Sequence, residues 1–387
     1  MSDHTGARIG APQAIEAIAS IFRTHHEQRH FSGAGLVKRG GETLFSGAYG
    51  YAHRGWRIPN TVSTRFDTAS ITKLFTAVAV LQLVERGLLS LHDRVLDILE
   101  LPGTSISPRV DVYHLLTHSS GIGDDADEEA GESYEAIWRD KPNYLVRETV
   151  DFLPQFVHKP ANFEPGDGCS YNNCAFVLAG LVVEKLTGQK YRDYVRENVF
   201  GRAGMSRTEF VAMDAVAENV AEGYTAVRDE NGEATGWRKN IYSFPPIGSP
   251  DAGAYTTVGD LDVFMRALTG NKLLSKQLTE DMLTPKVMYR HAARADYMMG
   301  YAFEFALEPG NGRIMYMQKD GDNPGVDGVL RYYSDTGTVV AILANQDCNV
   351  WDMAKEVDEV LKGLTGGVAL FRTARAEPCC MADDMPR

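Results

Sequence analysis

The chain lacks a long apolar segment. No stretch of its 387 residues is apolar enough to span a bilayer, and residues 1–21 carry acidic and polar side chains where a secretory leader has a basic start and an apolar run. We therefore expect no membrane association, and the cytoplasm as the compartment.

Positive charge is also scarce. The 39 Lys and Arg residues face 52 Asp and Glu residues, which gives 39 − 52 = −13 at pH 7. A phosphate backbone repels such a chain, and no basic cluster with interleaved aromatic residues offsets that repulsion. We expect no nucleic-acid partner. The acidic stretch 124–135 is interpreted as a solvated loop.

Cysteine is rare, and none of the cysteines has the paired spacing of a zinc site. An odd number in a chain without an export signal indicates reduced thiols rather than a disulfide framework. The adjacent Cys379 and Cys380 lie in a polar tail and receive no role. We expect neither a metal nor a cofactor. The cysteines are Cys169, Cys174, Cys348, Cys379 and Cys380.

The patterns that are present place strands at both ends of the chain and helices in the middle. An amphipathic helix is predicted over 12–29, followed by a hairpin of 34–38 and 43–49 around Gly40-Gly41. The predicted helices of the middle are 70–86, 110–118, 142–154, 173–187, 190–199, 258–269 and 275–283. The later strands are 301–307, 313–318, 328–333 and 338–344, and a last helix covers 352–364.

This order predicts an α/β (α+β) fold. One antiparallel sheet is built from the N- and C-terminal segments, with flanking helices, and a mostly helical domain is inserted between them. The expected division is 1–75 with 250–372 for the sheet domain, 76–249 for the helical domain and 373–387 for the tail. A cleft between the two domains is the natural place for a site.

Ser70 and Lys73 are three residues apart at the start of an apolar helical segment. Residues at this spacing share a helix face, so the Ser70 hydroxyl and the Lys73 amine can come within hydrogen-bonding reach. Burial lowers the pKa of a lysine, which allows it to accept a serine proton. The pair is a candidate nucleophile and base. The alternative is a capping serine beside an outward-reaching lysine.

Tyr171 precedes the helical segment 173–187 and follows a turn-forming segment, 163–166. A tyrosine at a loop-to-helix junction can present its hydroxyl to a cleft, where nearby cations favour the phenolate. The Asn173 amide can orient Lys73 or a substrate carbonyl. Its alternative role is the N-cap of the helix.

Lys319 and Gly321 follow the predicted strand 313–318. A cation and a glycine beside a cleft would hold an anionic substrate group and let the backbone approach a carbonyl. The backbone N–H of Asp322 is a candidate oxyanion donor. A polar turn between two strands is the alternative.

Together and in this order, the motifs resemble the serine β-lactamase and penicillin-recognising family, in its class C-like branch of cytoplasmic esterases, D-amino-acid peptidases and acyltransferases. The segments 66–73 (FDTASITK), 114–122 (HLLTHSSGI) and 171–173 (YNN) carry the resemblance, which covers about 15–364. It implies a β-lactamase/transpeptidase-like fold, Ser70 as nucleophile, and Lys73 and Tyr171 as a coupled proton-handling pair.

The third motif departs from the family pattern. It reads Lys319-Asp320-Gly321, so an acid stands where β-lactamases often carry a small hydroxyl residue. The resemblance therefore implies weak binding of carboxylate-bearing β-lactams. His114 and His118 are interpreted as structural. No Gly-x-Ser-x-Gly elbow is present, which disfavours an α/β-hydrolase.

The sequence thus predicts a serine hydrolase, a carboxylesterase acting through an acyl-enzyme at Ser70. The alternatives are an acyltransferase, a D-amino-acid peptidase or weak β-lactamase, and a catalytically idle ligand-binding protein. The expected partner is a small-molecule ester, amide or lactam, and a homo-oligomer is compatible with the sequence. The aromatic residues proposed to line an apolar acyl pocket are Tyr134, Trp138, Tyr224, Trp237, Tyr242 and Phe244.

Overall fold

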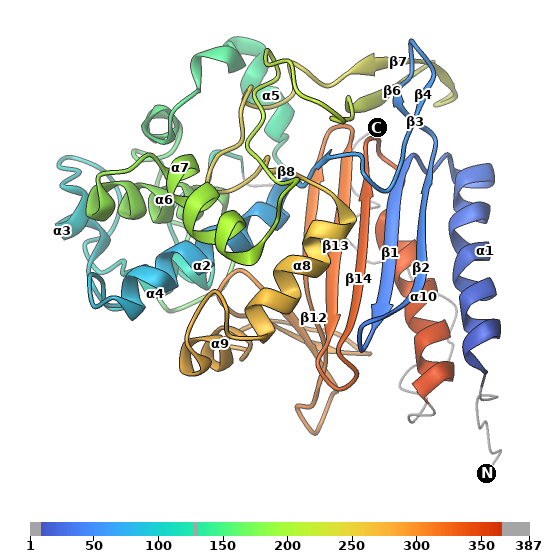
Figure 1. Ribbon diagram of the computed structural model, residues 1–387. Coiled ribbons are helices and arrows are strands. Elements are labelled where there is room, and N and C mark those ends of the chain that lie inside the picture. The colour runs from blue at the N-terminus through green and yellow to red at the C-terminus, as the bar shows by residue number, and fades with distance from the viewer. Residues whose placement is uncertain (1–8, 127–130, 366–387) are drawn as a thin grey trace.

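The framework of the fold is an eight-stranded antiparallel sheet (Figure 1). The computed structural model describes residues 9–126 and 131–365, so the expected tail with Cys379 and Cys380 lies outside the described residues. The strand order is β2-β1-β14-β13-β12-β11-β10-β9. These strands are β1 (Gly33–Arg39), β2 (Glu42–Tyr49), β9 (Val287–His291), β10 (Asp296–Met299), β11 (Glu304–Leu307), β12 (Ile314–Asn323), β13 (Val326–Tyr333) and β14 (Thr338–Ala344).

Pairing within the sheet joins the two ends of the chain. Strand β1 pairs with β14 from Gly33↔Ala344 to Arg39↔Thr338. Strand β14 is buried at every position, and residues 339–344 form a continuous apolar run, as expected for a strand covered on both faces. The prediction of one antiparallel sheet built from both ends of the chain is therefore confirmed.

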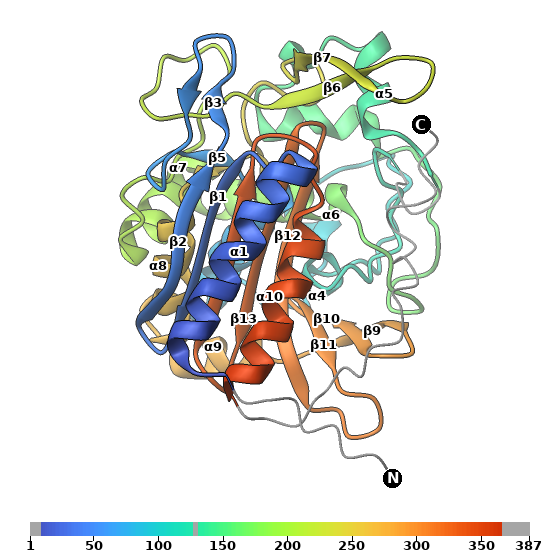
Figure 2. The same ribbon diagram turned by 90° about the vertical axis from the view of Figure 1, so that its right-hand side faces the viewer.

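Helices cover both faces of the sheet. The helices α1 (Ala11–Arg29) and α10 (Val350–Thr365) lie side by side on one face (Figure 2). Phe22 of α1 stacks on Phe45 of β2, with ring centroids 4.2 Å apart. On the opposite face, α8 (Val258–Thr269) contacts β1 and β14. The apolar sides of these helices thus close the core around the sheet.

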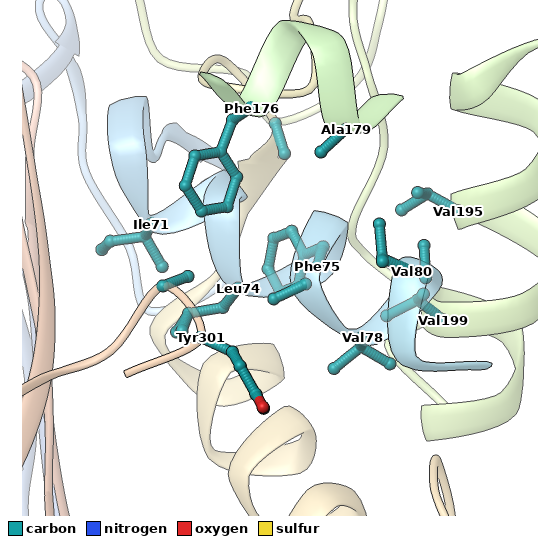
Figure 3. Packing of buried hydrophobic residues seen from close by; sticks show 14 of the residues in the cluster. Ile71, Leu74, Phe75, Val78, Val80, Phe176, Ala179, Val195, Val199 and Tyr301 are labelled. Atoms are coloured by element: carbon teal, nitrogen blue, oxygen red, sulfur yellow. The ribbon is translucent and has the colours of Figure 1, made fainter. Parts of the chain in front are cut away.

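The middle of the chain is mostly helical and lies beside the sheet (Figure 1). Its central helix, α2, is apolar on nearly all sides and is buried from its first residue to Leu83. Phe75 of α2 meets Phe200 and Phe264 edge to face, each with ring centroids 5.0 Å apart. Figure 3 shows Phe75 among other buried apolar side chains of the core. The helices are α2 (Thr72–Glu85), α3 (Val95–Leu99), α4 (Val112–Leu116), α5 (Tyr134–Asp140), α6 (Asn173–Thr187), α7 (Tyr191–Val195) and α9 (Lys276–Met282).

The helix predicted over 142–154 is wrong. Two 3₁₀ helices, Asn143–Leu145 and Thr149–Gln155, stand there, with extended backbone at Glu148 (φ −110°, ψ 156°) between them. Pro154 has no N–H to donate and its ring crowds the carbonyl of residue 150, so the last turn of the predicted helix cannot be regular.

Other predicted bounds are corrected in detail. The helix expected over 190–199 is α7 followed by a π-helix, Arg196–Gly201. The strand expected over 313–318 continues to Asn323, because the polar residues after 318 keep pairing with β13 as far as Asn323↔Val326. Two strands at one edge of the large sheet, β9 and β10, were not predicted. Three separate short ladders were also not predicted: β3 (Tyr51–His53) with β4 (Ile58–Pro59), β5 (Phe66–Asp67) with β8 (Tyr255–Thr256), and β6 (Tyr224–Arg228) with β7 (Ala234–Lys239). The expected domain boundaries at 75/76 and 249/250 stay a prediction.

A buried ion pair ties the terminal helix to the sheet. Arg331 of β13 donates to Asp358 of α10, and both side chains are almost fully buried. We expect Asp358→Ala to lower the free energy of unfolding by about 3–5 kcal/mol, because it leaves the Arg331 charge buried without its partner. Urea denaturation measures the change. Glu359→Ala, which removes a half-exposed partner of Lys362, is the control and should cost less than about 1 kcal/mol. Equal losses in the two variants would contradict this account.

Candidate active site

Ser70 lies on a strained turn between β5 and α2. The residues Ala69–Ile71 form a 3₁₀ turn in which Ala69 has a φ of 41°. The Asp67 carboxylate accepts the Ala69 backbone N–H at 2.7 Å, and the Thr68 N–H donates to the Ala254 carbonyl at 2.9 Å. Burial raises the pKa of Asp67 to about 6. These bonds hold a backbone conformation that alanine rarely adopts, and they fix the half-buried Ser70 at the start of the helix.

Lys73 is buried beside the serine and has no exposed surface. Its Nζ donates to Ser70 Oγ at 3.0 Å, to Asn173 Oδ1 at 2.8 Å and to the Asp251 backbone carbonyl at 2.9 Å. An amine at this distance can exchange a proton directly with the hydroxyl. The structure thus brings together the residues that the first two motifs proposed.

Tyr171 lies close to two lysines. Its ring centroid is 4.9 Å from Lys73 Nζ and 4.8 Å from Lys319 Nζ. Ammonium groups at this distance are attracted to the ring, and they stabilise negative charge that develops on the phenol oxygen. Lys319 therefore lies beside Tyr171, so the structure brings the third motif next to the first two.

The first turn of α6 positions Asn173. Asn172, not Asn173, caps this helix, because its Oδ1 accepts the Ala175 N–H at 2.7 Å. The Asp124 carboxylate accepts the N–H of Asn173 at 3.0 Å and of Cys174 at 2.9 Å. Asp124 is buried, so the solvated-loop interpretation is wrong at this residue. These hydrogen bonds at the N-terminus of α6 fix the turn from which Asn173 reaches Lys73.

His118 holds the segment around Tyr171 in three ways. Its carbonyl accepts the Ser170 N–H at 3.0 Å, and its Nδ1 accepts the Asn172 N–H at 3.0 Å. Its ring stacks on Tyr171 with centroids 4.6 Å apart. Burial, with Lys319 and Lys73 nearby, lowers the pKa of His118 well below its ordinary value. The neutral ring has the acceptor and the flat surface that this contact needs, a role that the sequence did not show.

Strand β12 passes directly against the serine turn at Gly321. A Cβ on Gly321 would lie 2.2 Å from the Thr68 carbonyl oxygen and 3.1 Å from the Ser70 backbone nitrogen. Only glycine allows strand and turn to approach this closely. Asp322 follows on the strand and is exposed.

One group of metal-ligand types occurs near the site. Donor atoms of Asp124, Asp125 and Cys174 lie within 4.8 Å of one another, and all three residues are buried. The Asp124 carboxylate already accepts two backbone N–H groups, and burial raises the pKa of the Cys174 thiol well above its ordinary value. This group is a hydrogen-bonded support for α6 rather than a thiolate ligand set.

Two of the six aromatic residues proposed for an acyl pocket line a cavity. Tyr134 and Phe244, together with Asp67, border a small cavity of about 20 Å³ beside the serine turn. Phe244 also packs against Ala69. The four that do not line this cavity are Trp138, Tyr224, Trp237 and Tyr242.

The family model described as Beta-lactamase matches residues 18–364. A penicillin-binding protein of Bacillus subtilis is 28% identical over 340 residues, which are 85% of this chain and 71% of the relative. Esterase EstB of Burkholderia gladioli is 33% identical over 218 residues, 55% of each chain. The resemblance that the motifs predicted is confirmed.

Solved structures show the same fold. The penicillin binding protein from Bacillus halodurans superimposes with a TM-score of 0.81 at 38% identity, covering 87% of this chain and 99% of its own. The octameric penicillin-binding protein homologue from Pyrococcus abyssi gives a TM-score of 0.77 at 25% identity, covering 91% and 77%. The predicted β-lactamase/transpeptidase-like fold is thereby confirmed.

Across residues 9–126 and 131–365, none of the helices is both long and apolar enough to cross a membrane.

A substitution at Gly321 tests the close approach of strand β12 to the turn that carries Ser70. We expect Gly321→Ala to lower kcat/KM for p-nitrophenyl acetate by about 100-fold, because the new methyl group must displace the turn that carries Ser70. The control is Gly236→Ala on β7, where an added Cβ meets no atom within 4 Å and the rate should not change. An unchanged rate in Gly321→Ala would contradict the geometry.

The neutral state of the buried His118 ring can be tested by measuring stability as a function of pH. Because the pKa of His118 is lower in the folded chain than in the unfolded chain, unfolding takes up a proton at mildly acidic pH. The wild type should therefore lose stability as pH falls below about 6.5, more steeply than His118→Asn, which does not titrate. Urea denaturation between about pH 8 and pH 5 measures both curves. Parallel curves would show that the imidazole is not held neutral.

Proposed function

Because the chain belongs to the Beta-lactamase family, we propose that it is a serine hydrolase, a carboxylesterase that works through a covalent acyl-enzyme on Ser70. The observation that carries the proposal is the 3.0 Å contact between Lys73 Nζ and Ser70 Oγ, made by a lysine without exposed surface. A hydroxyl needs a base within hydrogen-bonding distance to become a nucleophile, and this contact supplies one.

In the first step, the Ser70 hydroxyl attacks the ester carbonyl and its proton passes to the Lys73 and Tyr171 pair. The new bond joins Ser70 Oγ to the carbonyl carbon, and the carbonyl oxygen becomes an oxyanion. When the ester C–O bond breaks, the pair returns a proton to the departing alkoxide, which leaves as an alcohol. Lys73 and Tyr171 act together, so the proton belongs to the pair rather than to either residue.

The oxyanion is placed against the backbone N–H groups of Ser70 and Asp322. Donors that are fixed before the reaction stabilise charge that develops in the transition state. The close approach at Gly321 supports this assignment. A Cβ added to Gly321 would lie only 3.1 Å from the Ser70 backbone nitrogen, so strand β12 passes directly beside that nitrogen.

In the second step, water attacks the acyl carbon while the pair takes one of its protons. The acyl–Ser70 bond then breaks, Ser70 recovers its proton, and a carboxylic acid leaves. The likeness to Esterase EstB supports an ester as the substrate.

Substitutions of the three proposed catalytic residues test the scheme. We expect Ser70→Ala to remove all turnover of p-nitrophenyl butyrate, because no nucleophile remains. Lys73→Ala and Tyr171→Phe should lower kcat by roughly 10²- to 10⁴-fold, the usual contribution of a positioned acid or base. Steady-state kinetics with thermal unfolding of each variant separates loss of chemistry from loss of fold.

The matched control is Ser46→Ala, which removes an exposed hydroxyl from β2 and should retain full activity. A folded Ser70→Ala variant that kept wild-type turnover would refute Ser70 as nucleophile. Wild-type protein that is folded but inert toward every activated ester would refute the proposed esterase.

A further inference from the structure

Lys319 is paired within its own strand. Its side chain is 5% exposed, and its Nζ donates to Asp320 Oδ1 at 3.2 Å while lying 4.8 Å from the Tyr171 ring. An unpaired lysine at this place would attract an anionic substrate group. The contact with Asp320 weakens that attraction, because the two opposite charges offset each other.

Asp320 is fixed by a second contact, from the terminal helix. Its Oδ2 accepts the Trp351 Nε1–H of α10 at 3.1 Å, and its side chain keeps 38% exposure. Burial raises the pKa of Asp320, but the Lys319 ammonium and the Trp351 indole outweigh it, so that the pKa lies below its ordinary value. The carboxylate is therefore negatively charged at neutral pH and is accessible from solvent.

This charge lies one residue away from the closest approach of β12 to the nucleophile. Gly321 follows Asp320 and borders the Ser70 nitrogen, and the exposed Asp322 comes next. The segment 319–322 thus carries one positive and two negative side chains, a net charge of +1 − 2 = −1. Within this segment of β12, negative side chains outnumber the positive one.

We propose that Asp320 is a specificity-determining residue that excludes substrates with a carboxylate near the scissile bond, so that the substrates are esters uncharged at that position. This inference rests on the proposed hydrolase function. Like charges in a partly exposed cleft repel strongly enough to change reaction rates by roughly 10- to 100-fold.

The test compares two penicillins that differ in one charge. Benzylpenicillin and its methyl ester share the acyl group and the lactam, and only the first carries the carboxylate. Acylation of Ser70 by each is followed by intact-protein mass spectrometry in the wild type and in Asp320→Asn. The asparagine keeps an oxygen for the Trp351 indole and removes the charge, so a purely structural role would leave the ratio of rates unchanged.

The control is Asp335→Asn in the turn between β13 and β14, an exposed partner of Arg313. It makes the same change in net charge away from the β12 segment that borders Ser70. We expect the wild type to react at least about 10-fold faster with the methyl ester, Asp320→Asn to lose that preference by roughly 10- to 100-fold, and Asp335→Asn to keep it. If neither penicillin acylates the protein, p-nitrophenyl hydrogen succinate and its methyl ester give the same comparison.

Equal rates for acid and ester in the wild type, or an unchanged ratio in Asp320→Asn, would overturn the inference while leaving the hydrolase intact. Absence of any reaction with p-nitrophenyl acetate would refute the proposed function itself, and the inference with it. Turnover of p-nitrophenyl acetate in the same samples therefore separates the two failures.

Discussion

The complete burial of the Lys73 amine is the constraint on which the rest of the site depends. A polar group removed from water is stable only where hydrogen-bonding partners surround it. Here the oxygens of Ser70, Asn173 and the Asp251 carbonyl lie within 3.0 Å of Lys73 Nζ. Each oxygen belongs to a different part of the chain, so the fold must hold three segments in fixed positions around Lys73. Asp124 fixes the position of α6 by accepting the first backbone N–H groups of that helix.

The sheet contributes the other wall of the site. Strand β12 is held between β13 and β11, and its Gly321 brings the backbone against the serine turn. The same strand carries Lys319 and Asp320, whose pairing is anchored to α10 through Trp351. Because the sheet unites both ends of the chain, the terminal helix can influence the charge beside the nucleophile. The sheet thus positions Ser70 through Gly321, and through Lys319 and Asp320 it sets the charge beside Ser70.

Much of this site was predicted from short-range patterns in the sequence. The spacing of Ser70 and Lys73 and the junction at Tyr171 are short-range features, and the structure brings these residues together. The contribution of Asp251 was not predictable, because a backbone carbonyl has no side-chain signature. His118 acts through a contact across 53 residues of sequence, which periodicity does not report. The β6–β7 hairpin was missed because most of its second strand is exposed, which leaves no alternation of polar and apolar residues.

Covalent labelling tests most directly the claim that Ser70 is the activated nucleophile. The folded protein is treated with a fluorophosphonate, its intact mass is measured, and the modified peptide is mapped. The account predicts a single adduct on the peptide that contains Ser70, formed slowly or not at all when Lys73 is replaced by alanine. An adduct on another residue, or none on folded protein, would contradict it.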